Sequence, residues 1–195
     1  VIGQAREALS EGRSRLIARS AEQGQDVCAG DLSCFIDVLL PEPTLLIVGA
    51  GHIGQAVASM GAWLGYRIAV LDERPSELLP ERFPDADVLR CGSLREELAS
   101  YPLGEHVYVV LVTPHHAPDE EALAVLAQRE VPYVGLLGGR RRTEATFDRA
   151  RTMGVSDAFL ERIHTPIGLD IGAETPKEIA LSILVDVTAV RRGER

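Results

Sequence analysis

The residues best suited to bind a ligand follow the pattern Gly-x-Gly-x-x-Gly at positions 49–54, with an acidic residue about twenty positions later. The first glycine permits a tight turn after a strand, the second lets the backbone approach a pyrophosphate, and the third lets the next helix pack closely. An acid at this spacing reaches a ribose hydroxyl. The pattern predicts nucleotide-type binding, or alternatively a Rossmann scaffold whose pocket is vestigial or reassigned. The candidate binding residues are Gly49, Gly51, His52, Gly54 and Asp72.

A second group of reactive side chains lies at residues 113–119, directly after the apolar run 107–112. In an open parallel sheet this loop faces the glycine-rich turn across the crevice in which ligands bind. Adjacent histidines can hydrogen-bond an anionic ligand or transfer a proton, and we favour both roles over metal ligation. The alternative is a solvated loop in which Asp119 caps the next helix. The candidate binding residues are Thr113, His115, His116 and Asp119.

Three further segments contain residues that could contact a ligand. Paired glycines precede three arginines at residues 138–142. We expect this segment either to bind an anion or to be a run of charged residues exposed to solvent. The irregular segment 164–174 holds two glycines and two acids, which suits a functional loop or a plain crossover. A cysteine in the turn of a predicted hairpin is an exposed thiol for a soft ligand, or an inert residue. The candidates are Gly138, Gly139, Arg140, Gly168, Asp170 and Cys28.

Composition and charge restrict the class of protein. The 195 residues are 46% hydrophobic and 25% charged, as in a globular protein with a sizeable core. The net charge of −9 argues against nucleic-acid and anionic-membrane surfaces. We find neither an apolar run of about 18 residues nor a signal segment, so we expect a cytoplasmic protein. The three cysteines lack CxxC spacing, which favours neither a disulfide framework nor a zinc site.

These loops must be positioned by the strands and helices that alternate from Thr44 onward. The alternation predicts an α/β fold with a Rossmann-like, doubly wound parallel sheet of strand order 3-2-1-4-5. Residues 175–178 match a capping box that opens a helix. Trp63 and Tyr66 are expected to be packing residues. The predicted strands are 45–48, 68–72, 87–90, 107–112 and 133–137, and the predicted helices are 55–64, 94–100, 118–130, 140–153 and 179–190.

The first forty residues differ from the rest of the chain. Residues 4–11 suit a short helix that stops at Gly12, and residues 13–19 and 32–40 suit the two strands of a hairpin. Because a two-stranded hairpin is marginal by itself, we interpret residues 1–40 as a small, incomplete N-terminal α+β segment. The prolines of residues 41–43 make a stiff linker, and residues 44–195 form the cofactor-binding domain.

These motifs together resemble the XdhC/CoxI family of accessory factors for xanthine dehydrogenase and related molybdenum hydroxylases. The resemblance covers residues 44–192 and is carried above all by PIGLDIGAETP at residues 166–176. It implies a non-catalytic, cytoplasmic chaperone that binds molybdopterin-type cofactor as cargo. The implied partners are a cysteine desulfurase, which installs the sulfido ligand, and the apo-hydroxylase. The family usually has Cys-Gly-Gly and Gly-Ser-Arg where this chain has Cys28-Ala29-Gly30 and Gly138-Gly139-Arg140.

Two other functions remain open at this point. An NAD(P)-dependent oxidoreductase could use His115 or His116 as an acid or base, and Asp72 would favour NAD over NADP. A nucleotide-sensing regulatory module would bind nucleotide without turnover. We also expect a homodimer, from the incomplete hairpin and the apolar helix 179–190.

Overall fold

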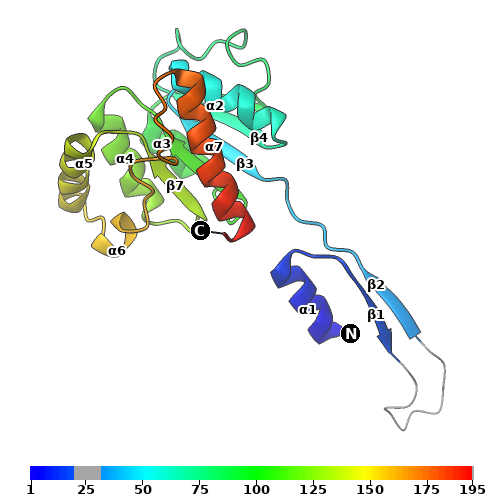
Figure 1. The fold of residues 1–195 in the computed structure, drawn as a ribbon. Coiled ribbons are helices and arrows are strands. Elements are labelled where there is room, and N and C mark those ends of the chain that lie inside the picture. Colours follow the sequence, from blue (N-terminus) through cyan, green and yellow to red (C-terminus); the bar gives the residue numbers. More distant parts are fainter. Residues whose placement is uncertain (20–31, 195) are drawn as a thin grey trace. The chain divides into compact units, whose positions relative to one another are not determined.

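The computed structural model describes residues 1–19 and 32–194, without the side chains of residues 18, 19, 32 and 116. The chain divides into two compact units, Val1–Pro41 and Glu42–Arg195 (Figure 1). None of the helices in the described part of the chain is both long and apolar enough to cross a membrane.

In the first unit, the residues that the structure describes form one helix and an antiparallel pair of strands. The helix α1 (Ile2–Glu11) ends at Gly12, whose φ of +62° is the left-handed conformation that favours glycine. Strands β1 (Arg15–Arg19) and β2 (Leu32–Ile36) pair with Leu16 opposite Phe35, and both of these side chains are exposed. The predicted helix and hairpin are thus confirmed, although both strands are shorter than expected.

The second unit contains a five-stranded parallel sheet in the order β5-β4-β3-β6-β7. The central strands are buried along their whole length and, apart from Thr44, are apolar, because helices cover both faces of the sheet. The order corresponds to the predicted 3-2-1-4-5 and confirms the Rossmann-like fold. The strands are β3 (Thr44–Val48), β4 (Arg67–Asp72), β5 (Val88–Cys91), β6 (Val107–Leu111) and β7 (Tyr133–Leu136).

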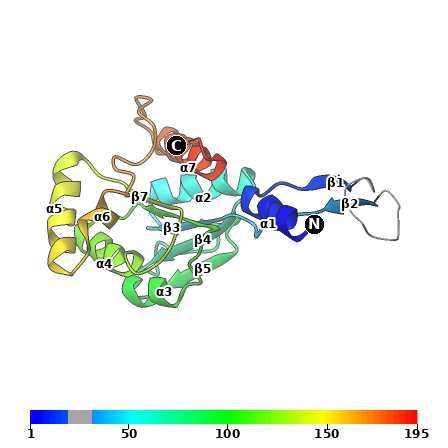
Figure 2. The same cartoon turned by 90° about the horizontal axis from the view of Figure 1, so that it is seen from below.

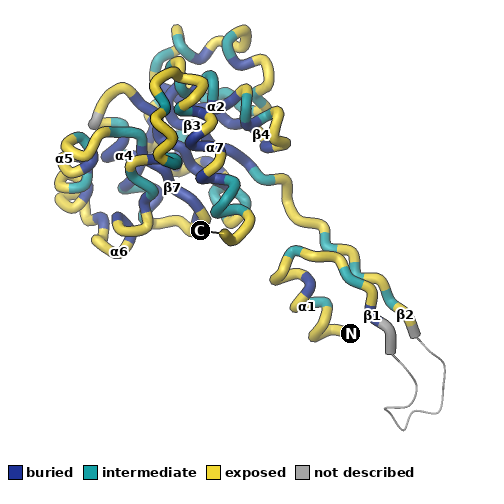
Figure 3. Tube along the Cα trace, viewed as in Figure 1, coloured by how far each residue is buried: buried dark blue, intermediate teal, exposed yellow. Residues whose placement is uncertain are grey.

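The helices form one layer on each face of this sheet (Figure 2). Helices α2 and α7 pack on one face in the apolar cluster around Leu45 and Ile183. Helices α3 to α6 pack on the other face in the cluster around Leu46 and Leu126. The strands between the layers form the buried core in Figure 3. The helices are α2 (His52–Trp63), α3 (Leu94–Ser100), α4 (His116–Leu126), α5 (Arg140–Thr152), α6 (Asp157–Leu160) and α7 (Pro176–Arg192).

Several details differ from the sequence prediction. Helices α2 and α4 begin three and two residues earlier than expected, at His52 and His116. The four-residue helix α6 was not predicted, because it is too short to show a helical period; its one local signal is Ser156, whose side chain caps it. Tyr66 is buried as expected, but Trp63 is 84% exposed, so its assignment as a packing residue was wrong.

Candidate functional site

The glycine-rich turn has the geometry that its pattern predicts. Gly49 has a φ of +116°, and a Cβ there would lie 2.7 Å from the carbonyl oxygen of Val112. A Cβ on Gly54 would lie 2.0 Å from the carbonyl oxygen of Gly49, so the turn and α2 approach too closely for a side chain. By contrast, a Cβ on Gly51 would meet no atom within 4 Å. The start of α2, where His52 is exposed, therefore leaves room for an anion at its free N–H groups.

Asp72, at the end of β4, is buried and fully hydrogen-bonded. Its Oδ2 accepts from the backbone N–H of Ala50 at 2.6 Å and from Nη2 of Arg74 at 2.8 Å. Its Oδ1 accepts from the backbone N–H and the Nε of Arg74, both at 2.9 Å. Burial alone would raise the pKa of Asp72, but these hydrogen bonds outweigh burial and lower it. The expected ribose-binding carboxylate is thus bound to Arg74, a residue that sequence reasoning missed.

The loop after β6 is fixed by Asp119 and Arg142. Asp119 is 0% exposed, and its oxygens accept from Oγ1 of Thr113 at 2.5 Å and from Nη2 of Arg142 at 2.7 Å. The same guanidinium donates to the carbonyl oxygens of Thr113 and His115, at 2.9 and 3.0 Å. Asp119 lies inside α4, and the cap position is His115, so the alternative in which Asp119 caps this helix is wrong.

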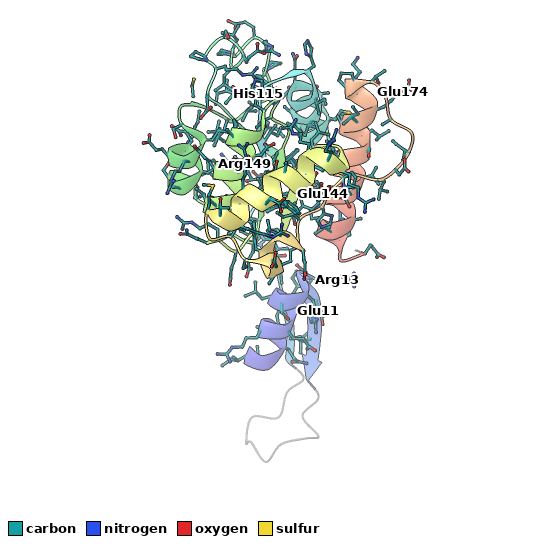
Figure 4. All side chains as sticks on the ribbon, turned by 90° about the vertical axis from the view of Figure 1, so that its left-hand side faces the viewer. Glu11, Arg13, His115, Glu144, Arg149 and Glu174 are labelled. Carbon is teal, nitrogen blue, oxygen red and sulfur yellow. The ribbon has the colours of Figure 1, made fainter. Side chains whose placement is uncertain are left out.

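The two histidines of this loop are placed unequally. His115 is exposed on the segment that precedes α4 (Figure 4). The side chain of His116 lies outside the described part of the structure, as does the whole of Cys28. Across the residues that are described, no group of three or more histidine, cysteine or acidic side chains is arranged to hold a metal ion.

The arginines after β7 have different partners. Arg140, the one chosen from the sequence, is 92% exposed and pairs with Glu144 of α5, a residue labelled in Figure 4. Arg142 instead faces the loop after β6 and binds Asp119. Gly139 caps α5, and a Cβ there would meet no atom within 4 Å, whereas a Cβ on Gly138 would lie 3.3 Å from Arg142. Two of the three arginines at the start of α5 are thus paired with carboxylates of the protein, Arg140 with Glu144 and Arg142 with Asp119.

Two separate cavities contain six of the candidate residues. A crevice of about 50 Å³ lies among residues of the glycine turn, the end of β4 and the loop after β6. A larger cleft of about 870 Å³ lies between α7 and the segment 161–173, and includes Gly168 and Asp170. The structure therefore brings the first two predicted groups together and places Gly168 and Asp170 elsewhere. The candidate residues that line the crevice are Gly49, Asp72, Thr113 and His115.

The chain has relatives among known families, proteins and structures. Residues 45–187 match the XdhC Rossmann domain. The chain is 36% identical to the uncharacterized protein YqeB of Escherichia coli, over 99% of the chain and 36% of that protein. It is 30% identical to a probable xanthine dehydrogenase subunit from Bacillus subtilis, over 81% of the chain and 46% of that protein.

A solved structure extends the likeness to three dimensions. A xanthine dehydrogenase from Bacillus halodurans superposes with a TM-score of 0.71 at 27% identity, and the match covers 85% of the chain and 46% of that protein. The chain thus spans less than half of the length of each of these three proteins.

Proposed function

The chain belongs to the XdhC family, and from this premise we propose that it binds a molybdopterin-type cofactor as cargo. It protects the sulfurated cofactor and inserts it into a xanthine dehydrogenase-type molybdenum hydroxylase. Two relatives carry xanthine dehydrogenase in their names, which supports such an enzyme as the partner. A cysteine desulfurase would supply the sulfur, and Cys28 is a candidate contact for the cofactor.

One observation carries this proposal. At the start of α2 the phosphate-binding half of the dinucleotide motif is open, since no atom lies within 4 Å of a Cβ on Gly51, while at the crevice the ribose-binding half is closed by the pair of Asp72 and Arg74. A ligand held by its phosphate suits this arrangement better than one held by a ribose hydroxyl. Molybdopterin carries a phosphate, and its dinucleotide forms carry a pyrophosphate.

The pairing of charges around the crevice also supports binding rather than catalysis. Asp72 and Asp119 are each held by an arginine, so neither is arranged as a free acid or base beside the crevice. The exposed His115 is free to hydrogen-bond the anionic end of a ligand at the mouth of the crevice.

The experiment is a titration of the full-length protein with molybdopterin, followed by transfer to the apo-hydroxylase. Gly51→Glu places a carboxylate where the phosphate would bind, and no atom of the protein obstructs the new side chain. We expect this variant to fold, to bind at least about tenfold more weakly and to lose transfer, because like charges repel at close range. Gly3→Glu, at another unobstructed glycine, is the matched control and should bind normally. Equal binding by both variants, or full hydroxylase activity without this protein, would contradict the proposal.

The second candidate function is an NAD(P)-dependent oxidoreductase, which the complete Gly-x-Gly-x-x-Gly turn and the position of Asp72 favour. Here Arg74 would have to release Asp72 before the carboxylate could bind ribose. NADH turnover that is abolished by His116→Ala would establish this function instead. Nucleotide binding without turnover, and without an effect on a hydroxylase, would indicate a regulatory module.

A further inference from the structure

The larger cleft contains a histidine whose orientation is fixed by two buried residues. Nδ1 of His164 lies 3.0 Å from Oδ2 of Asp186, and the hydroxyl of Tyr133 donates to the same oxygen at 2.8 Å. Asp186 is 1% exposed, and the rings of Tyr133 and His164 lie 4.5 Å apart. The backbone of His164 is also held, because its N–H and C=O bond to Val134 and Leu136 of β7. His164 is therefore a rigid group at the wall of the cleft.

The hydrogen bond to Asp186 decides what this histidine offers to a ligand. An ionised carboxylate only accepts hydrogen bonds, so Nδ1 must carry the proton. In the neutral ring Nε2 is then a hydrogen-bond acceptor. Asp170, exposed on the same cleft, supplies a second acceptor. The site is thus suited to a ligand that presents N–H donors.

The remaining lining disfavours a phosphate and favours a flat ring. Besides His164, three carboxylates and only one guanidinium, that of Arg162, line the cleft, and they disfavour an anion. Its other walls are largely apolar and can cover the faces of a planar group. Its volume of about 870 Å³ lies in the range of small-molecule sites. The apolar lining residues are Leu137, Ile163, Pro166, Ile167, Leu169, Ile171, Ala173 and Ile179.

The first turn of α5 connects this cleft to the crevice. Arg142 bonds to the loop after β6, which borders the crevice. The next residue, Thr143, has its Oγ1 3.0 Å from Oγ1 of Thr165, which lines the cleft. Two neighbouring residues of one helix turn thus contact loops that line the two cavities.

We infer that the cleft beside His164 is a second ligand site, which takes a planar nitrogen heterocycle with N–H donors. His164 and Asp170 hydrogen-bond the ring, and Asp186 is the positioning residue that fixes the tautomer of His164. The identification of this ring as the pterin of the cargo rests on the proposed function. The same chemistry is also found in the bases of nicotinamide and adenine nucleotides.

The test measures binding of three probes to the full-length protein: a pterin without phosphate, nicotinamide mononucleotide and adenosine monophosphate. We expect the pterin to bind, about tenfold more weakly to His164→Ala and several-fold more weakly to Asp170→Asn, because each variant loses a hydrogen-bonding group. Asp170 is exposed, so its replacement keeps the fold even where that of His164 does not. His106→Ala, at the opposite end of the sheet beside Thr44, is the matched control and should bind normally.

Asp186→Asn tests the positioning role separately. The amide can donate to Nδ1, which moves the ring proton to Nε2 and removes the acceptor. We expect weaker pterin binding together with a change in the nitrogen NMR signals of His164 that marks the other tautomer. A merely structural role for Asp186 would lower stability and leave the tautomer unchanged.

The outcomes separate this inference from the proposed function. If a nucleotide binds through His164 and the pterin does not, the heterocycle site is supported, but its occupant is a nucleotide base and not the pterin of the cargo. If molybdopterin binds equally to wild type and to His164→Ala, the proposed function stands and the inference is overturned. Failure of all three probes to bind would also overturn the inference.

Discussion

At the scale of single residues, two buried carboxylates, each paired with an arginine, fix the segments around the crevice. Asp72 joins the end of β4 to the glycine turn through Ala50. Asp119 joins α4 to the start of α5 through Arg142. A buried charge is costly without a partner, so each pair fixes the position of the loop that carries it.

Asp72→Asn tests the first pair. Since the folded pKa of Asp72 is lowered, its contribution to stability is present above its ordinary pKa of 3.8 and is lost as pH falls through the lower folded value. We expect the variant to lose about 1.5–3 kcal/mol of unfolding free energy near neutral pH, as for hydrogen bonds to a charged group. The difference from wild type should shrink below pH 3.8. Urea unfolding across pH, with the exposed Asp85→Asn as control, measures it; a difference independent of pH would contradict this account.

Arg142→Ala tests the second pair. The change leaves Asp119 buried without its guanidinium, so we expect a loss of about 3–5 kcal/mol of unfolding free energy. Arg140→Ala, in the same turn of α5 but 92% exposed, should change stability by less than about 0.5 kcal/mol. Denaturant unfolding compares the two variants. Similar losses for both would show that the charge of this turn, and not the bond to Asp119, determines stability.

At the scale of elements, α7 begins with a complete capping box. The Oγ1 of Thr175 accepts from the backbone N–H of Glu178, and the carboxylate of Glu178 accepts from the backbone N–H of Thr175. Backbone hydrogen bonds from Thr175 and Glu174 lower the pKa of Glu178. The box fixes where α7 starts, and so where Ser182 and Asp186 enter the cleft.

Thr175→Ala removes half of this box. We expect the unfolding free energy to fall by about 1 kcal/mol, the usual cost of a lost N-cap hydroxyl. Thr188→Ala, within the same helix, lacks a capping role and should be close to neutral. Thermal unfolding of the two variants checks this. A larger loss for Thr188 would indicate that packing, rather than the cap, controls α7.

The order of the elements could be predicted from the sequence, but their pairwise contacts could not. Apolar runs, glycines and the capping box are local signals that predict the elements and their order. In a parallel sheet of this order, ligands bind at the carboxyl ends of the strands where the order reverses, and this rule predicted that the loop after β6 faces the glycine turn. The bond of Arg142 to Asp119 joins residues 23 positions apart, and that of His164 to Asp186 joins residues 22 apart. Such pairs depend on side-chain directions in the folded chain. Trp63 was wrongly predicted to be buried for the same reason. Only the packing of the folded chain decides which side chains at the end of α2 are buried.

At the scale of the whole molecule, the second unit contains every element needed for its own core. Its five strands and the helices on both faces lie within Glu42–Arg195. The described residues of the first unit form one helix and two strands and include few buried side chains. The crevice and the cleft are both lined by residues of the second unit alone.

We therefore expect residues 42–195, expressed alone, to fold and to unfold in one cooperative transition. The midpoint of thermal unfolding should lie within about 4 °C of that of the full chain, a shift that corresponds to about 1–2 kcal/mol at most. Residues 1–41 alone should lack stable structure, since a two-stranded hairpin is marginal in water. Circular dichroism on heating measures both fragments. The shortened protein should also bind the pterin probe like the full chain, because the cleft lies in the second unit. A large loss of stability or of pterin binding would show that the first unit supports the Rossmann unit.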